Sequence, residues 1–247
     1  MNCSFVILTW NRSPMLEKCL EMLVASIGNK NDCEIIIYDN FSPDNTKEII
    51  ENFYEKYSES ITIKTIYGQE NVGLSAYKKL FALAKGNIII EVDDDILQFP
   101  SKVDEVFKIY FEKFKDFGYL ALDVVQNEHT TGAKPDLKNY KVIERDGMSL
   151  ELGPTGGWCT GFRRRDFNKI KFIFNSFNHY NFKHGEDGFL SKLFRILGKK
   201  SAIISGIKCF HATGPYYSKE YGLLDRDIEK YMKSNRSDLV EWYSSFK

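Results

Sequence analysis

Short runs of apolar residues alternate with amphipathic stretches along the first half of the chain. The runs are mostly apolar and only seven or so residues long, as expected of strands that are buried on both faces. They predict strands at residues 3–9, 33–39, 60–67, 87–93 and 119–125. Because helical stretches separate these strands, we predict an α/β fold with a doubly wound, mostly parallel sheet.

Capping and turn residues indicate where the intervening helices begin and end. We expect helices over residues 14–27, from Ser42 onward, over 73–86 and from 100 toward 117. Ser42 can cap the second helix, with Pro43 in its first turn, and Gly86 can close the third. This alternation predicts that ligands bind beyond the carboxyl ends of the strands, where loops and helix N-termini converge.

The second half of the chain has a different pattern. Residues 127–152 are polar and predict a loop followed by a hairpin that turns at 145–147. After Pro215 the sequence is helical, and Leu224 and Ile228 belong to one apolar stripe. We expect this tail to pack on the core, to pair subunits or to rest on a membrane surface; packing is the default, and the mixed charge weighs against the membrane.

Composition narrows the classes of partner. The 247 residues suit one domain with a C-terminal extension, and 34 basic residues balance 34 acidic ones, which removes a global electrostatic reason to bind nucleic acid. No apolar run approaches the roughly 18–20 residues that cross a bilayer, and the first residues lack the features of a signal peptide. The five cysteines have no metal-binding spacing, so we expect reduced thiols. These observations predict a cytoplasmic protein.

Three consecutive carboxylates, Asp93, Asp94 and Asp95, follow the fourth predicted strand. At the carboxyl edge of a parallel sheet such a cluster typically binds a hard divalent cation, whose charge cancels the mutual repulsion. The alternative is that the carboxylates cap the next helix and face water. A glycine-rich phosphate-binding loop that would pair with a Walker B strand is absent from the sequence.

A family resemblance favours metal binding over helix capping for the three carboxylates. It rests on four segments of the sequence: "FVILTWNR", "IIYDNFSPDNT", "ENVGLSAYKKLFALAKGNIIIEVDDD" and "HGEDGFLSKLFRILGKK". In this order and spacing they resemble the family 2 inverting glycosyltransferases, from Phe5 to about Gly214. The resemblance implies the Rossmann-like GT-A fold with a C-terminal helical extension. It implies a nucleotide-sugar-binding half at residues 1–126, an acceptor-binding half of the same domain at 127–214 and a helical tail at 215–247.

The resemblance also implies a donor site. Its residues would be Thr9, Asn11, Arg12, Asp39, Asn71, Gly73, Lys78, Asp93 and Asp94. Asp39 would contact the base and Asp93 the ribose region, while Asp95 would ligate a Mn²⁺ or Mg²⁺ ion that bridges the diphosphate. His211, in "CFHATG", would complete the metal or diphosphate site. The sequence departs from the family pattern at Asn40, where a second aspartate is usual, and at Lys78, where an arginine is common.

The acceptor site is implied by "GPTGGWCTGFRRRDF" and by the Glu-Asp pair. Gly157 would let the backbone approach a sugar, and Trp158 would stack on the acceptor ring or fill the core. Asp187 would be the catalytic base, with Glu186 holding acceptor hydroxyls, unless both only cap a helix. We further expect part of residues 127–152 to fold over the donor.

The expected reaction is metal-dependent transfer from a nucleotide-diphosphate sugar, predicted to be a UDP-sugar, to an acceptor hydroxyl with inversion, in glycan or cell-surface polysaccharide synthesis. The acceptor is expected to be a glycan, a lipid-linked saccharide or a protein, and nucleic acid is not expected as a partner. The alternatives are a retaining transferase on the same fold and a catalytically silent nucleotide- or glycan-binding module. A peripheral contact with the inner face of the membrane stays open.

Overall fold

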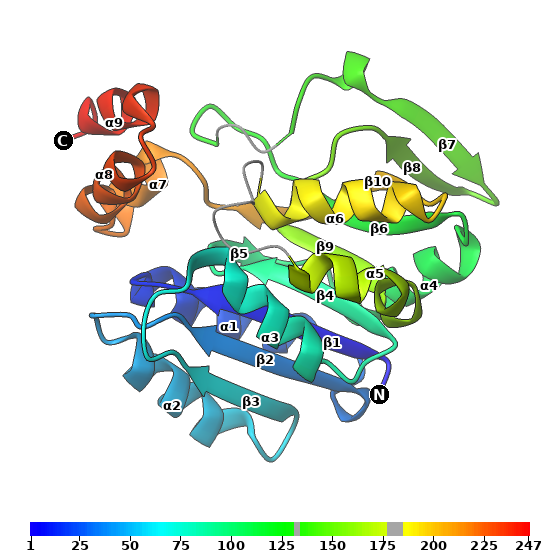
Figure 1. Ribbon diagram of the computed structural model, residues 1–247, viewed down its shortest axis with the longest axis horizontal. Helices are drawn as coiled ribbons and strands as arrows, with labels where there is room; N and C mark the ends of the chain where they lie inside the picture. The colour runs from blue at the N-terminus through cyan, green and yellow to red at the C-terminus, as the bar shows by residue number, and fades with distance from the viewer. Residues whose placement is uncertain (131–133, 177–184) are drawn as a thin grey trace.

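A single mixed sheet forms the centre of the protein (Figure 1). The computed structural model describes residues 1–130, 134–176 and 185–247. Within these residues the sheet has ten strands in the order β3-β2-β1-β4-β9-β6-β10-β8-β7, with β5 paired to β10. The strands are β1 (Cys3–Thr9), β2 (Cys33–Asp39), β3 (Thr62–Tyr67), β4 (Ile88–Asp93), β5 (Ile96–Gln98), β6 (Phe117–Val124), β7 (Lys141–Arg145), β8 (Met148–Leu152), β9 (Cys159–Arg163) and β10 (Lys200–His211).

The first four strands of this order form the parallel half of the sheet. β1 pairs in parallel with both β2 and β4, and β2 pairs in parallel with β3. The register sets Thr9 opposite Asp39 and Leu8 opposite Asp93. The carboxyl ends of β1, β2 and β4 therefore meet at one edge of the sheet, which is where loops and ligands gather in α/β folds.

Helices cover both faces of the sheet, as the sequence predicts. They are α1 (Ser13–Ser26), α2 (Thr46–Tyr57), α3 (Ala76–Leu83), α4 (Val103–Lys113), α5 (Arg164–Ser176) and α6 (Gly185–Ile196). Leu20 of α1, Phe53 of α2 and Phe107 of α4 belong to the core on one face. Leu80 of α3 and Phe194 of α6 belong to the core on the other. The doubly wound α/β fold is confirmed.

β9 is the main departure from a purely parallel sheet. It lies between β4 and β6 and runs antiparallel to both. The pairing of β10 with β6 is again parallel, and the hairpin β7–β8 joins the sheet through β8 and β10. The hairpin turns at the predicted place, where Asp146 and Gly147 both have positive φ, the backbone that a tight two-residue turn requires.

Several predicted helix boundaries are wrong, including the starts of α3, at Ala76 rather than residue 73, and of α4, at Val103 rather than residue 100. α2 begins at Thr46, because the Ser42 hydroxyl accepts a hydrogen bond from the Asn11 N–H at 2.8 Å and so braces a loop rather than capping the helix. α3 ends at Leu83, before Gly86. A Cβ at Gly86 would lie 2.5 Å from the Ser4 backbone nitrogen, so this glycine allows two chain segments to touch. α4 ends at Lys113, short of the predicted 117.

The tail forms α7 (Pro215–Glu220), α8 (Leu224–Lys233) and α9 (Ser237–Ser244), which group at one end of the molecule (Figure 1). Leu224, Ile228 and Tyr243 form a small apolar cluster between α8 and α9. Arg226 of α8 donates to the Trp10 carbonyl at 2.8 Å, so the tail packs on the core as expected. None of the helices in the described part of the chain is both long and apolar enough to span a bilayer.

Candidate active site

The acidic triplet lies where β4 ends and turns into β5. Asp93 is the last residue of β4, and Asp94 and Asp95 form the turn. β5 pairs with β10, whose last residue is His211. The backbone of this pairing continues into a bond from the Ala212 N–H to the Asp95 carbonyl at 2.9 Å. Two strands from distant parts of the sequence thus bring His211 to the triplet.

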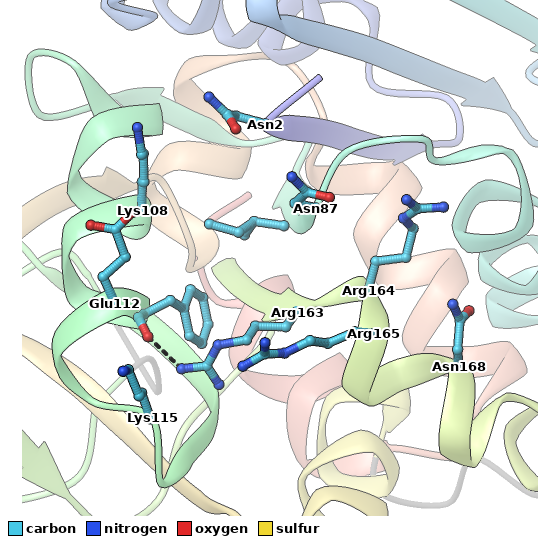
Figure 2. A pocket seen from close by; sticks show the side chains of 11 residues that line it. Asn2, Asn87, Lys108, Glu112, Lys115, Arg163, Arg164, Arg165 and Asn168 are labelled. Carbon is cyan, nitrogen blue, oxygen red and sulfur yellow. Dashed lines mark hydrogen bonds between the residues drawn. The ribbon is translucent and has the colours of Figure 1, made fainter.

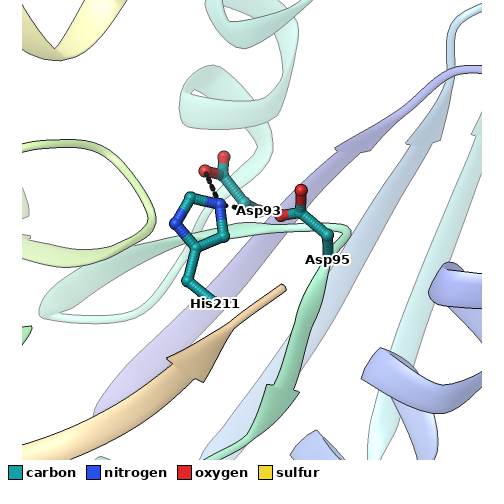
Figure 3. A group of neighbouring side chains, drawn as sticks. All are labelled: Asp93, Asp95 and His211. Atoms are coloured by element: carbon teal, nitrogen blue, oxygen red, sulfur yellow. Dashed lines mark ion pairs between the residues drawn. The ribbon is translucent and has the colours of Figure 1, made fainter. Parts of the chain in front are cut away.

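Asp93, Asp95 and His211 converge on one point (Figure 3). One ligand atom from each lies within 4.8 Å of the others. His211 Nε2 is 3.0 Å from Asp95 Oδ1 and 3.6 Å from Asp93 Oδ2. Asp95 Oδ1 is buried and faces the His211 imidazole. Two carboxylate oxygens and an imidazole nitrogen are a donor set that suits a divalent ion such as Mn²⁺.

The charges of this cluster are strongly coupled. Burial, followed by the nearby Asp95 charge, raises the pKa of Asp93 to about 7. Burial would raise the pKa of Asp95, but Arg12 and His211 lower it on balance. Burial would lower the pKa of His211, yet Asp95 and Asp93 raise it. Without an ion, protons on His211 and Asp93 therefore offset the negative charge that a cation would otherwise neutralise.

Asp94 is turned away from this cluster. Its Oδ2 accepts from the Thr9 hydroxyl at 2.8 Å, and its Oδ1 accepts from Arg12 Nη1 at 2.9 Å. The same Arg12 nitrogen is 2.7 Å from Asp95 Oδ2. Both oxygens of Asp94 are thus engaged within the protein, and Arg12 cross-links two carboxylates of the triplet. Of the predicted donor-binding residues, Thr9, Arg12 and Asp94 contact one another.

The other predicted donor-binding residues line the same edge. Asp39 ends β2 and accepts from the Ser42 N–H at 3.0 Å, and burial raises its pKa. Asn40 replaces an aspartate that is usual in the family pattern. Its amide donates to Asn71 Oδ1 at 2.9 Å and to the Gly73 carbonyl at 3.2 Å. Asn40 therefore holds the loop after β3 against the loop after β2.

Asn11 and Lys78 complete the predicted donor set. Asn11 has a φ of 53°, a left-handed backbone that Asn tolerates better than most residues and that bends the loop after β1. Lys78 lies on α3, is half-buried and has no hydrogen bond or ion pair with any other described residue. The structure thus leaves its ammonium group available.

The predicted acceptor residues come from the segment before β9 and from the start of α6. Glu186 and Asp187 occupy the first turn of α6, where the helix dipole favours negative charge. Burial raises the pKa of both carboxyl groups. A Cβ at Gly157 would lie 3.2 Å from Glu186 Oε1 and 3.3 Å from the Asp187 Cβ, so the glycine leaves room for this pair.

Trp158 lies beneath these residues. Its indole N–H donates to the Leu122 carbonyl at 2.9 Å, and only 5% of the residue is exposed. Its ring centroid is 6.5 Å from that of His211. With so little surface open, Trp158 forms the floor of the site and belongs to the core, which was the alternative interpretation of this residue.

One cavity joins the metal cluster to the acceptor residues. It has a volume of about 410 Å³, and its walls include Asp93, Gly157, Trp158, Asp187 and His211. Pro135 lines it as well, so part of the segment after β6 borders the cavity; residues 131–133 of that segment lie outside the described residues. Two members of the candidate metal cluster and a carboxylate with a raised pKa therefore open into the same space.

The sequence pattern does not predict two acidic residues of the site, Glu91 and Asp227. Glu91 of β4 is fully buried, and a Cβ at Gly157 would lie 3.2 Å from its Oε1 as well. Asp227 of α8 is 3.7 Å from Arg12 Nη2 and accepts from the Ser218 hydroxyl at 2.5 Å. Glu91 stands inside an apolar run and Asp227 in a charged helix, and neither pattern carries a signal of a site.

The strand order, the acidic tip of β4 and the cavity beside it define a glycosyltransferase of the GT-A fold. The chain matches the family described as "Glycosyl transferase family 2" over residues 4–171, and it belongs to that family. It is similar to an uncharacterized glycosyltransferase of Nostoc sp., at 27% identity over 69% of this chain and 53% of the relative. It is also similar to a poly(ribitol-phosphate) beta-glucosyltransferase of Bacillus spizizenii, at 30% identity over 38% of this chain and 15% of the relative. The matches thus span about half or less of these relatives.

Solved structures share the fold. The mannosyltransferase PcManGT from Pyrobaculum calidifontis, solved with GDP-Man and Mn²⁺, aligns with a TM-score of 0.66 at 12% identity, over 99% of this chain and 73% of that chain. Residues 1–349 of S. aureus TarS align with a TM-score of 0.64 at 16% identity, over 100% of this chain and 71% of that chain. TarS has also been solved with UDP and with UDP-GlcNAc.

Proposed function

We propose that this protein transfers a sugar from a nucleotide-diphosphate sugar, a UDP-sugar, to an acceptor hydroxyl with inversion, and that it works in cell-surface polysaccharide synthesis. The observation that supports the proposal is the shared cavity, which is lined by Asp187 and by Asp93 and His211 of the candidate metal cluster. The TarS complexes with UDP and UDP-GlcNAc support the donor, and the poly(ribitol-phosphate) relative supports the type of acceptor.

In this proposal the two halves of the domain have separate roles. Residues 1–126 bind the donor, with Asp39 toward the base and Asn40 holding the loops that surround it. Residues 127–214 bind the acceptor at Gly157 and Glu186. Residues 215–247 brace the loop after β1, the donor loop, because Asp227 contacts Arg12 of that loop. Asp93, Asp95 and His211 would hold Mn²⁺ or Mg²⁺, which supplies positive charge opposite the departing diphosphate.

The protein's own part in the chemistry is to orient the acceptor and remove its proton. The acceptor oxygen bonds to the anomeric carbon while the bond from that carbon to the phosphate oxygen breaks. The hydroxyl proton passes to a carboxylate oxygen of Asp187. A pKa raised by burial makes Asp187 a better base than an exposed aspartate, and such proton transfer contributes about 10²–10⁴ in rate. A single displacement of this kind inverts the anomeric centre.

The decisive experiment separates binding from turnover. UDP, GDP and their sugars are screened with Mn²⁺ by thermal shift, and the donor that stabilises the protein is used in a transfer assay with acceptor glycans. Asp187→Asn should lower turnover at least about 100-fold while the thermal shift persists. Glu59→Gln changes an exposed carboxylate in the turn after α2; it is the matched control and should leave both unchanged.

Three outcomes would count against the proposal. Full turnover by the Asp187→Asn protein would remove the assigned base and favour a different catalytic group. A product whose anomeric configuration matches that of the donor, read by NMR, would establish a retaining reaction instead. No nucleotide-dependent shift with any diphosphate would favour a module that binds only glycan.

A further inference from the structure

A second cavity opens at the opposite edge of the sheet. It has a volume of about 560 Å³ and lies where β1 and β4 begin and β9 ends, between α4 and α5 (Figure 2). β4 runs six residues from Ile88, at this cavity, to Asp93, at the catalytic cluster. At about 3.3 Å per residue the two sites are separated by roughly 17 Å of strand. The two cavities are therefore separate and share no lining residue.

The walls of this cavity are strongly basic. Five of the lining side chains are cationic and one, Glu112, is acidic. Arg163 is buried and already engaged, because it donates to the carbonyls of Phe111 at 2.5 Å and Phe117 at 2.7 Å. It thereby engages the Phe111 carbonyl near the end of α4 and the Phe117 carbonyl at the start of β6. The partial negative charge of these oxygens would otherwise repel an anion. The remaining cations are Lys108, Lys115, Arg164 and Arg165.

These four cations have no counter-charge of their own. Among the described residues, none of the four side chains forms a hydrogen bond or an ion pair. Lys108 and Lys115 come from α4 and the segment after it, while Arg164 and Arg165 open α5, so the charges approach from two sides (Figure 2). A protein with balanced total charge thus concentrates unpaired positive charge in one concave place, which focuses the local potential on anions.

Polar groups around the opening also favour an anion. α5 is 13 residues long and directs its N-terminal backbone N–H groups toward this end, where Asn168 lines the wall one turn on. The one acidic residue in its first turn, Asp166, is buried and lies 3.4 Å from Arg163. Asp166 is therefore neutralised by a residue that takes no direct part in binding.

We propose that this cavity binds a ligand that carries two or more phosphate groups. Arginine presents a planar fork that matches phosphate oxygens, and two arginines with two lysines exceed what one phosphate can neutralise. The volume likewise exceeds the needs of a single small anion. A soluble polyphosphate compound and the headgroups of an anionic lipid share this chemistry, and the test distinguishes the two sources.

The soluble source is tested by calorimetry with tripolyphosphate. EDTA is present, so that no divalent ion can hold the probe at the catalytic cluster. We expect binding that weakens about tenfold or more in the double variant Arg164→Ala/Arg165→Ala, since bonds to charged groups are strong. Lys108→Ala/Lys115→Ala removes the same charge from the other wall and should have a similar effect. Lys171→Ala/Arg195→Ala, two exposed cations of α5 and α6, should bind as the unaltered protein does.

The lipid source is tested by co-sedimentation with vesicles of phosphatidylglycerol in phosphatidylcholine, against phosphatidylcholine alone. Binding in either arm that depends on the four cations supports the proposal and identifies the source. The proposal is overturned if neither probe binds, if the cavity variants bind the probe as tightly as the unaltered protein does, or if the control variant loses as much affinity as the cavity variants. None of these outcomes depends on turnover.

Discussion

Asp93 makes metal binding depend on pH near neutrality. Its pKa is raised to about 7 by burial and by Asp95, and a carboxylate must lose its proton to bind a cation. We expect the apparent affinity for Mn²⁺ to fall at least about tenfold per pH unit below 7 and to level off well above it. Calorimetry in buffers of different ionisation enthalpy would count the protons released.

A matched variant separates the two titrating ligands. In Asp93→Asn the pH dependence that remains would belong to His211, whose pKa the neighbouring carboxylates raise. A Mn²⁺ affinity that stays constant from pH 5 to pH 8 in the unaltered protein would show that these groups are not the ligands.

Glu91 should destabilise the protein as pH rises. It is fully buried, and burial followed by the Glu186 charge raises its pKa well above normal. The folded protein thus holds a proton that the unfolded chain releases, so stability falls as pH rises from about 4.5 toward the folded pKa. Glu91→Gln, which mimics the protonated form, should stabilise the protein by at least about 1 kcal/mol at pH 8 and by little at pH 4. Urea denaturation at both pH values measures this difference.

At the scale of elements, helix α8 should act on the donor loop through Asp227. This carboxylate is buried between Arg12, Arg226 and the Ser218 hydroxyl. Removing one partner of a buried ion pair typically costs about 3–5 kcal/mol. We expect Asp227→Ala to lose stability on that scale and to bind UDP and Mn²⁺ more weakly, because Arg12 is freed to shift against Asp95.

The same helix supplies the control for this prediction. Asp225 is 86% exposed and pairs with Lys247 at the surface, where an ion pair is worth about 0–1 kcal/mol. Asp225→Ala should therefore change neither stability nor binding appreciably. If both variants bind UDP equally well, the tail does not support the donor site.

The elements that the sequence predicts well are those with local signals. β1, β2 and β4 are apolar runs, and the 145–147 turn has the chemistry of a hairpin. β9 has no such signal, since "CTGFR" is short and mixed, and its place between β4 and β6 depends on pairing with strands far away in the sequence.

The residues of the candidate site likewise fall into those with a local sequence signal and those without one. The triplet, the Glu-Asp pair and His211 stand in recognisable phrases, and the structure brings the triplet to His211 through the pairing of β5 with β10. Glu91 and Asp227 matter because of what lies next to them in space. A single sequence carries no record of those contacts.

At the scale of the whole molecule, stability should decrease from the centre of the sheet to its margins. β1 and β6 are almost wholly buried, whereas β7 is mostly exposed and α9 contributes a single buried residue, Tyr243. We expect amide hydrogens of β1 and β6 to exchange at rates near the global unfolding limit and those of β7 and α9 orders of magnitude faster. Hydrogen exchange read by mass spectrometry tests this order, and equal protection of β7 and β6 would contradict it.

The contact between Arg12 and Asp227 joins two segments that are made far apart in time. At about 5–20 residues per second, α8 is synthesised roughly 10–40 s after the loop that it braces. Until then Arg12 lacks its contact with Asp227 and has Asp94 and Asp95 as its ion-pair partners. The nascent chain therefore passes through a period in which the sheet can form but the donor loop is unbraced, and competence to bind nucleotide should arrive late, with the last helices.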